Sequence, residues 1–410
     1  MNIPKLRFKD NNDNDYPNWV NSTIGKSGYF YYGKSAPKWS ITDTATTPCV
    51  RYGELYTTHN IIVKKIYSYT NIPKENLKFS TGNEVLVPRV GEEPLDFCKC
   101  CYLPFKDVAI GEMISVYNTK NNPLFISYMF NGTMKYKFAR LVEGGNVSNL
   151  YYSYLENISI NLPCLEEQKK IANFLSTVDK KITNLENTIT SLENQKKGLL
   201  QQIFSQKLRF KDKNGNNYPN WEKKKITDIA ITYIGLVTTM TKFYVEKGIP
   251  LIRNSDIKEN KFIFNEQIFL DENFAKNNSS RQHKLNDIIT VHTGDVGTSA
   301  IIDEKLVNSI GFATIVTRIK NFNKYNPKYV CWYLNSPICK SKIYTMITGD
   351  GRNNLNMKDF NKLYIPIPYL EEQTKIADFL SAFDRKLENQ KAQLEHWKQI
   401  KKGLLQQMFV

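Results

Sequence analysis

The residues of this chain that could do chemistry are few, and their spacing does not match a catalytic or metal site. Cys98, Cys100 and Cys101 lie close together, but no second pair follows at zinc-ligand spacing. The GKS of Gly25–Ser27 lacks the first glycine of a phosphate-binding loop, because Val20 takes that place. The four histidines in 410 residues leave few general bases. We therefore expect no metal and no cofactor in this chain.

Three further catalytic motifs are incomplete or absent in this chain. The DEK of residues 303–305 is typical of a charged turn between strands. The HTGDVG of residues 292–297 contains too little of a dinucleotide-binding fingerprint. An adenine methyltransferase would carry Asn or Asp followed by Pro-Pro and an aromatic residue to hold a flipped base, and no such tetrapeptide is present. The sequence predicts a chain that binds and does not catalyse.

Composition indicates a basic globular protein. The chain has 56 Lys and Arg against 40 Asp and Glu, a net charge of +16, which favours a polyanionic partner. An incidentally basic soluble protein is the alternative. The length predicts two or more domains. The absence of a signal peptide pattern or an apolar run of about 18 residues, with seven scattered cysteines, predicts a cytoplasmic protein with reduced thiols.

The chain is built from two tandem units. Residues 165–204 and 370–409 match without a gap at an offset of 205, beginning LEEQKKIANFL and LEEQTKIADFL. The segments LRFKD and YPNW also occur twice, at residues 6–10 and 16–19 and again at 208–212 and 218–221. Because the chain begins with the segment that follows the first repeated stretch, the repeat is circular, and we expect the two chain ends to lie close together.

Between these matching parts lie two bodies, residues 20–159 and 222–364, whose sequences hardly match. Strand-like apolar runs and short helical stretches predict a mixed α/β fold for both. The bodies converge again at their ends, where GGNVSNL at 144–150 aligns with GDGRNNL at 349–355. This distribution indicates one shared framework that presents two different surfaces.

Each repeated stretch has the pattern of a long helix. Pro163 and Pro368 precede the helices, and apolar residues then recur at alternating spacings of three and four, with a polar break at Lys196 and Lys401. Two such seams predict an antiparallel coiled coil; two amphipathic helices on separate cores are the alternative. The coiled part, about 26 residues or ~39 Å, is close to one turn of B-DNA, about 34–36 Å. The predicted fold class is α+β, with two pseudo-symmetric bodies joined by this coil.

The LEEQ–IA–FL–D–KI pattern of the helices, the INLP and IPIP lead-ins and the LRF–YPNW segments resemble the specificity subunit of type I restriction–modification enzymes, over all 410 residues. The resemblance implies target recognition domains at 1–164 and 206–369, each reading half of a split asymmetric DNA site. It implies central and C-terminal conserved helical regions, 165–205 and 370–410, that form the coiled coil, set the spacer and dock two modification subunits.

The resemblance also implies that catalysis resides in the partners. Two modification subunits would methylate adenine at N6 with S-adenosylmethionine, and two restriction subunits would use ATP and Mg to translocate and cleave DNA. Two alternatives remain open: a coiled-coil scaffold that links two protein-binding modules, and a self-sufficient DNA enzyme.

Polar and basic residues on loops of the bodies are the candidates for reading base edges. An ordinary surface or turn-forming role is the alternative for each. The candidates are Arg51, Tyr52, Arg89, Lys99, Asn146, Ser148 and Asn149 in the first body, and Arg253, Asn254, Arg281, His283, His292, Thr293, Arg352 and Asn353 in the second. Apolar residues near the helix starts are predicted to dock modification subunits, namely Ile171, Phe174, Ile376 and Phe379.

Overall fold

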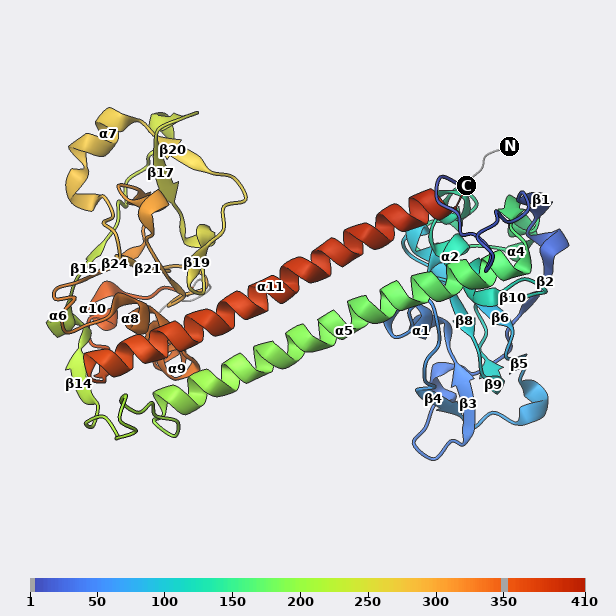
Figure 1. The fold of residues 1–410 in the computed structure, drawn as a ribbon, viewed down its shortest axis with the longest axis horizontal. Coiled ribbons are helices and arrows are strands. Elements are labelled where there is room, and N and C mark those ends of the chain that lie inside the picture. The colour runs from blue at the N-terminus through green and yellow to red at the C-terminus, as the bar shows by residue number, and fades with distance from the viewer. Residues whose placement is uncertain (1–3, 348–352, 410) are drawn as a thin grey trace. The chain divides into compact units, whose positions relative to one another are not determined.

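The computed structural model describes residues 4–347 and 353–409 and divides them into two compact units. The first unit is the chain up to Glu186 together with the chain from Ala392 onward, and the second is Asn187–Lys391. Two long helices, α5 (Leu165–Phe204, green in Figure 1) and α11 (Leu370–Met408, red), each contribute to both units. Among the described residues, no helix is both long and apolar enough to cross a membrane.

The first body contains two four-stranded sheets. One has the order β2-β10-β6-β8 and the other β4-β3-β9-β5. In the second sheet β3 and β9 run parallel, with β4 antiparallel to β3. The strands of the two sheets are β2 (Gly28–Tyr32), β10 (Ile114–Thr119), β6 (Glu84–Pro88), β8 (Cys101–Leu103), β4 (Ser68–Thr70), β3 (Thr47–Val50), β9 (Lys106–Ile110) and β5 (Phe79–Thr81).

Smaller elements complete the first body. They are the pair β1 (Val20–Thr23) and β13 (Ser159–Leu162), the sheet of β11 (Glu143–Gly144), β12 (Ser148–Asn149) and β7 (Val90–Gly91), and the helices α1 (Tyr52–Thr57), α2 (Pro123–Asn131), α3 (Lys135–Ala139) and α4 (Tyr152–Leu155).

The second body repeats this architecture. One sheet has the order β15-β24-β21-β22, and in the other β17 runs parallel to β23 and antiparallel to β20. Its elements are β14 (Glu222–Lys225), paired with β25 (Tyr364–Ile367), α6 (Ile226–Ile229), β15 (Ala230–Ile234), β16 (Tyr244–Val245), β17 (Ile249–Ile252), β18 (Ile257–Lys258), β19 (Lys261–Phe262), β20 (Ile268–Leu270), α7 (Glu272–Asn277), β21 (Ile288–Thr290), β22 (Ser299–Ile301), β23 (Ile310–Gly311), β24 (Ile315–Ile319), α8 (Pro327–Leu334), α9 (Pro337–Tyr344) and α10 (Met357–Phe360).

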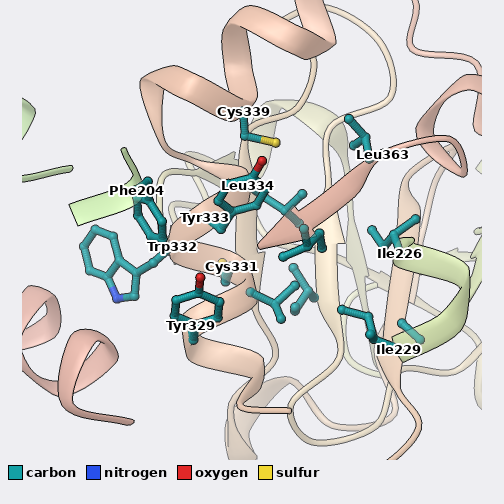
Figure 2. Close-up of a cluster of buried hydrophobic side chains, with 14 of the residues drawn as sticks. Phe204, Ile226, Ile229, Tyr329, Cys331, Trp332, Tyr333, Leu334, Cys339 and Leu363 are labelled. Carbon is teal, nitrogen blue, oxygen red and sulfur yellow. The ribbon is translucent and has the colours of Figure 1, made fainter. Parts of the chain in front are cut away.

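Each body is built onto the ends of the long helices. In the second unit, Phe204 of α5 packs against Tyr329 and Tyr333 of α8, with ring centroids 5.8 and 5.4 Å apart (Figure 2). In the first unit, Phe409 beyond the end of α11 packs against Phe125 of α2 at 5.3 Å. Aromatic rings bury large apolar areas, so the second body anchors the end of α5 and the first body the end of α11.

Within each unit the two helices run antiparallel. In the first unit Lys401 pairs with Asp179, and the earlier residue Lys398 pairs with the later Glu186. The second unit shows the same reversal, with Asp384 bound to Lys196 and Lys391 to Glu193. The predicted fold, with two mixed α/β domains and long helices that pack together, is confirmed. The four predicted domain boundaries stay a prediction.

The segment that begins the described chain binds the end of α11. The backbone nitrogen of Leu6 donates to the carbonyl oxygen of Gln407 at 3.0 Å. Farther along the chain, the nitrogen of Leu208 makes the equivalent bond to Gln202 at the end of α5. The described residues nearest the two chain ends, represented by Leu6 and Gln407, thus lie close together, as expected.

Candidate nucleic-acid interface

Three loops of the second body meet, and each carries residues predicted to read DNA. Asn254, just after β17, accepts a hydrogen bond at its Oδ1 from the backbone nitrogen of His292, just after β21, at 2.9 Å. Thr293 donates through Oγ1 to Asn354 Oδ1 at 2.7 Å. Asn353 precedes Asn354 in the late loop and is exposed. The structure thus brings together four predicted residues that are far apart in the sequence.

The hydrogen bonds of this cluster fix the tautomer of His292. Its Nδ1 lies 2.9 Å from Thr293 Oγ1. Since the Thr293 hydroxyl proton goes to Asn354, Nδ1 carries a proton and donates it to Thr293. Burial lowers the pKa of His292, which favours this neutral ring. The remaining nitrogen, Nε2, is then an acceptor, and the exocyclic amines of adenine and cytosine are the donors in the major groove that it could accept from.

The side chain of Arg253 is held by its own turn. It donates through Nε and Nη2 to Asp256, at 3.1 and 3.0 Å, and through Nη2 to the carbonyl of Glu266 at 3.0 Å. These contacts stabilise a 3-10 turn, η6 (Asn254–Asp256), and leave the side chain 30 % exposed. The Arg281 side chain donates to the carbonyl of Ile234 at 2.8 Å. Both arginines are partly structural, and Arg352 lies outside the described residues.

His283 is a core residue, which corrects its prediction as a base reader. Its side chain is fully buried. Ser309 donates its hydroxyl proton to the Leu306 carbonyl, so His283 Nδ1 must donate to Ser309 Oγ, 2.9 Å away. Nε2 is buried without a partner, and burial lowers the pKa of His283 to about 3. A neutral ring enclosed in this way cannot reach a base edge.

In the first body the corresponding cluster surrounds Arg89, which follows β6. Its guanidinium lies over the rings of Tyr32 and Tyr151, 4.3 and 5.6 Å from their centroids. The next strand, β7, pairs with β12, which carries Ser148 and Asn149. Cation–π stacking pre-orients the arginine. The structure therefore brings Arg89, Ser148 and Asn149 together, as it does the matching segments of the second body.

The other candidates of the first body differ in exposure. Ser148 is buried, and its hydroxyl donates to the Gly145 carbonyl at 3.3 Å, which corrects its prediction as a base reader, whereas Asn146 in the same loop is exposed. Tyr52 at the start of α1 is 37 % exposed. Lys99 is paired with Asp96 at 2.8 Å.

Arg51 occupies the same place in the first body that Arg253 occupies in the second. The nitrogen of Arg51 donates to Glu54 at 2.7 Å, and that of Arg253 to Asp256 at 2.8 Å, each an acid three residues later. Both arginines follow strands that have a parallel partner, β3 and β17. The segments CVRYGEL, which contains Arg51, and LIRNSDI, which contains Arg253, therefore occupy equivalent places in the fold.

The two loop clusters are equivalent in topology. In each body the third strand of the first sheet leads into a segment that pairs with a loop near the end of the body. In the first body β6 leads into β7, which pairs with β12. In the second body β21 leads to Thr293, which pairs with Asn354. Asn354, Tyr32 and Tyr151 were not predicted from the sequence. Asn354 directly follows two predicted residues, Arg352 and Asn353. Tyr32 lies inside a strand, where no local signal marks it.

A family model described as type I restriction modification DNA specificity domain matches residues 16–194 and 218–396, most of both units. The chain belongs to this family. The predicted function, a type I restriction–modification DNA specificity subunit with two target recognition domains, is confirmed at that level. The family is one of DNA recognition, not catalysis.

Similar proteins agree with the family. The MjaVIII type I restriction enzyme specificity subunit of Methanocaldococcus jannaschii is 24 % identical over 74 % of each chain. The EcoBI specificity subunit of Escherichia coli is 24 % identical over 64 % of this chain and 59 % of its own. The crystal structure of a type I restriction–modification S subunit from M. genitalium shares the fold, with a TM-score of 0.62 at 18 % identity over 99 % of both chains.

The predicted docking residues of this specificity subunit separate into two pairs. Ile171 and Ile376 are fully buried in the cores of their units, so their prediction as docking residues is corrected. Phe174 and Phe379 are 38 % and 39 % exposed. They make the same edge contact, with Phe8 and Phe210, at ring distances of 5.5 Å each.

The cysteine cluster is part of the core. Cys98, Cys100 and Cys101 are buried and unoxidised, and burial raises the pKa of each thiol. In the described part of the chain, no group of three or more His, Cys, Asp or Glu side chains could hold a metal ion.

Proposed function

We propose that this specificity subunit directs adenine-N6 methylation and restriction to a split, asymmetric DNA site in the cytoplasm, with one half-site read by each recognition domain. The observation that supports this most directly is the pair of equivalent loop clusters with unlike side chains. The cluster of the first body contains Arg89, stacked on Tyr32 and Tyr151. The cluster of the second body contains Asn254, His292 and Thr293. Equivalent positions that present different donors and acceptors suit two different half-sites.

The chemistry of each cluster favours a different readout. A stacked guanidinium such as that of Arg89 can donate two parallel hydrogen bonds to the O6 and N7 of guanine. The neutral His292 ring can accept from an exocyclic amine, and the amides beside it can pair with adenine. The net charge of +16 supplies attraction to the phosphates, which carries no sequence information.

The catalytic steps belong to partner subunits in this proposal. Two modification subunits would dock at the two matching aromatic surfaces, Phe8 with Phe174 and Phe210 with Phe379, and methylate adenine with S-adenosylmethionine. Two restriction subunits would supply ATP- and Mg-dependent translocation and cleavage. One structural neighbour, 15 % identical over 96 % of this chain and 98 % of its own with a TM-score of 0.58, is described as showing complex assembly of the type I system.

The test is a methylation map. Cells that carry this chain with its cognate modification subunit should contain N6-methyladenine in one bipartite motif, detected by long-read sequencing. A chain expressed without the modification subunit is the control and should methylate nothing. An absence of any bipartite adenine motif would contradict the proposal, and absence of DNA binding by the purified complex would favour the scaffold alternative. Methylation by the chain alone would indicate an enzyme.

A further inference from the structure

The two polar breaks in the helix seams are filled by matching ion pairs. In the first unit Lys401 Nζ lies 2.6 Å from Asp179 Oδ1, and the side chains are 25 % and 24 % exposed. In the second unit Lys196 Nζ lies 2.6 Å from Asp384 Oδ1, with side chains 14 % and 23 % exposed. Each lysine comes from the second half of one long helix and each aspartate from the beginning of the other.

An aromatic residue of the recognition domain completes each site. Tyr128 of α2 donates through its hydroxyl to Asp179 Oδ2 at 2.7 Å, and Lys401 lies 5.9 Å from the centre of its ring. Burial, and then the neighbouring Asp179, raise the pKa of Tyr128 far above its ordinary value, so this donor keeps its proton. In the second unit Lys196 lies 5.1 Å from the ring centre of Trp332 of α8.

Trp332 is itself tied to α11. Its Nε1 donates to Ser381 Oγ at 3.3 Å, one turn before Asp384. We call Lys401, Asp179 and Tyr128 the first junction. We call Lys196, Asp384 and Trp332 the second junction. Each junction joins α5, α11 and the helix of the recognition domain that packs on them.

The partial burial of the junctions separates them from the other ion pairs of the coil. Lys391–Glu193 and Lys398–Glu186 link the same two helices, but all four side chains are more than 40 % exposed. Exposed pairs of this kind contribute little to stability. Pairs removed from water also contribute little net stability, but they penalise every arrangement that leaves one partner unpaired.

A shift of the two helices by one heptad would leave the lysines without their partners. A shift in one direction would bring Lys196 opposite Ala377 and Lys401 opposite Ala172. A shift in the other direction would bring Lys196 opposite Lys391. The first shift leaves all four charges of the two pairs without a partner. The second shift brings Lys401 opposite Glu186 but opposes Lys196 with Lys391 and leaves both aspartates opposite apolar residues, so both alternative registers are disfavoured.

We propose that the two junctions are positioning elements that fix the register of α5 against α11 and the seat of each recognition domain on the pair. They thereby set how strictly the protein discriminates the number of base pairs between the half-sites. This inference rests on the proposed function, because it requires two half-sites with a spacer.

The test neutralises both junctions with little change in side-chain size. The variant carries Lys401→Met, Asp179→Asn, Lys196→Met and Asp384→Asn, and it is purified in complex with the modification subunit. Its affinity is compared for the natural site and for sites with one base pair added to or removed from the spacer. We expect a melting temperature close to that of the natural protein and a loss of about tenfold in spacer discrimination, equivalent to about 1.4 kcal/mol.

A matched control removes the exposed pairs on the same helices. It carries Lys391→Met, Glu193→Gln, Lys398→Met and Glu186→Gln, and we expect natural spacer discrimination. If the junction variant folds and still discriminates as the natural protein does, the inference is overturned. If the natural complex binds regardless of spacer, the proposed function fails first.

A second variant covers the case in which the neutralised chain does not fold. It exchanges the charges, with Lys401→Asp and Asp179→Lys in one junction and Lys196→Asp and Asp384→Lys in the other. Because pairing is preserved with reversed sign, we expect folding and spacer discrimination to return. Failure of the exchanged charges to restore either one overturns the inference.

Discussion

Glu167 and Glu372 are fully buried carboxylates at matching positions in the two copies of the repeat. Arg7 donates through Nε and Nη2 to Glu167 at 3.0 and 2.7 Å, and Trp19 donates through Nε1 at 3.2 Å. The second copy repeats this arrangement with Arg209 and Trp221 on Glu372. Bidentate arginine bonds of this kind are strong and directional. The LRF, YPNW and LEEQ motifs are therefore parts of one structural site.

Replacement of Arg7 should lower the free energy of unfolding, because Glu167 is buried. We expect Arg7→Met to lower the free energy of unfolding of the first unit by about 3 kcal/mol, because Glu167 would stay buried without its arginine partner. Urea-induced unfolding of the full chain measures the change. Lys9→Met removes an exposed ion pair with Asp13 in the same segment and should change stability by less than about 0.5 kcal/mol. Equal effects of the two variants would contradict this account.

His283 should make stability fall at acidic pH. Its pKa is lowered to about 3 by burial, with a smaller effect from Arg318, so the unfolded chain binds a proton here below about pH 6.5 and the folded chain does not. Above about pH 6.5 neither state binds this proton, so His283 does not lower the free energy of unfolding. As the pH falls from about 6.5 toward about 3, proton binding by the unfolded chain lowers that free energy progressively. We expect His283→Gln to lose about 2 kcal/mol less than the natural chain between about pH 7.5 and about pH 5. His396→Gln, at an exposed position of α11, is the control and should keep the natural slope.

The two loop clusters should act on opposite halves of the DNA site. We expect His292→Ala to relax base discrimination in the half-site read by the second recognition domain, by about 1–3 kcal/mol for each lost contact, and to leave the other half unchanged. Arg89→Ala should do the reverse. Competitive binding to sites that are altered in one half at a time measures both variants. A uniform loss of affinity across all sites would instead indicate phosphate contacts.

At the scale of elements, the start of each long helix is tied to its body by a glutamine. Gln373 is fully buried; its side chain accepts from the nitrogen of Asn326 at 2.8 Å and donates to the carbonyls of Pro368 and Lys324 at 2.9 Å each. Gln168 binds the nitrogen of Asn122 in the same way. The bond to Asn326 orders the residue that caps α8, so one amide links two helix N-termini.

Loss of this amide should be costly. We expect Gln373→Leu to lower the free energy of unfolding of the second unit by about 2 kcal/mol, since three backbone groups would lose a partner and the bond to the Pro368 carbonyl is fully buried. Gln406→Leu at an exposed position of α11 is the matched control and should be near neutral. Chemical denaturation measures both, and a loss below about 1 kcal/mol for Gln373→Leu would show that water replaces the amide.

The long helices could be predicted from the sequence, because their apolar spacing and flanking prolines are local signals. The start of α5 at Leu165 and of α11 at Leu370 agrees with those signals. The shared topology of the bodies could not be predicted, since parallel pairs such as β3 with β9 join segments far apart in chains that no longer match. The burial of His283 and Ser148 also escaped prediction, because polar residues in turn-like sequence look exposed until their tertiary partners are known.

At the scale of the whole molecule, the first and last strands of each recognition domain pair with each other. β14 pairs with β25 at the two ends of the second body, and β1 pairs with β13 at the ends of the first. Entry and exit therefore lie side by side in both bodies, so a body can be exchanged without moving the framework.

Exchange of one body should change half of the recognised site. We expect a chain in which residues 222–364 come from another family member to keep one half of its methylated motif and acquire a new second half. Methylation mapping with the unchanged modification subunit measures the outcome. Exchange of residues 20–159 is the reciprocal control and should alter the other half. A change in both halves after either exchange would contradict independent reading.

The contribution of the last residues to the first unit has a consequence for synthesis on the ribosome. The second unit is one continuous stretch, Asn187–Lys391, and can acquire its fold as it emerges. The first unit is begun earlier, yet its core takes in Met408 and Phe409. The larger part of the first unit is thus translated before the second unit, but its core is completed only after it, when Met408 and Phe409 have been added.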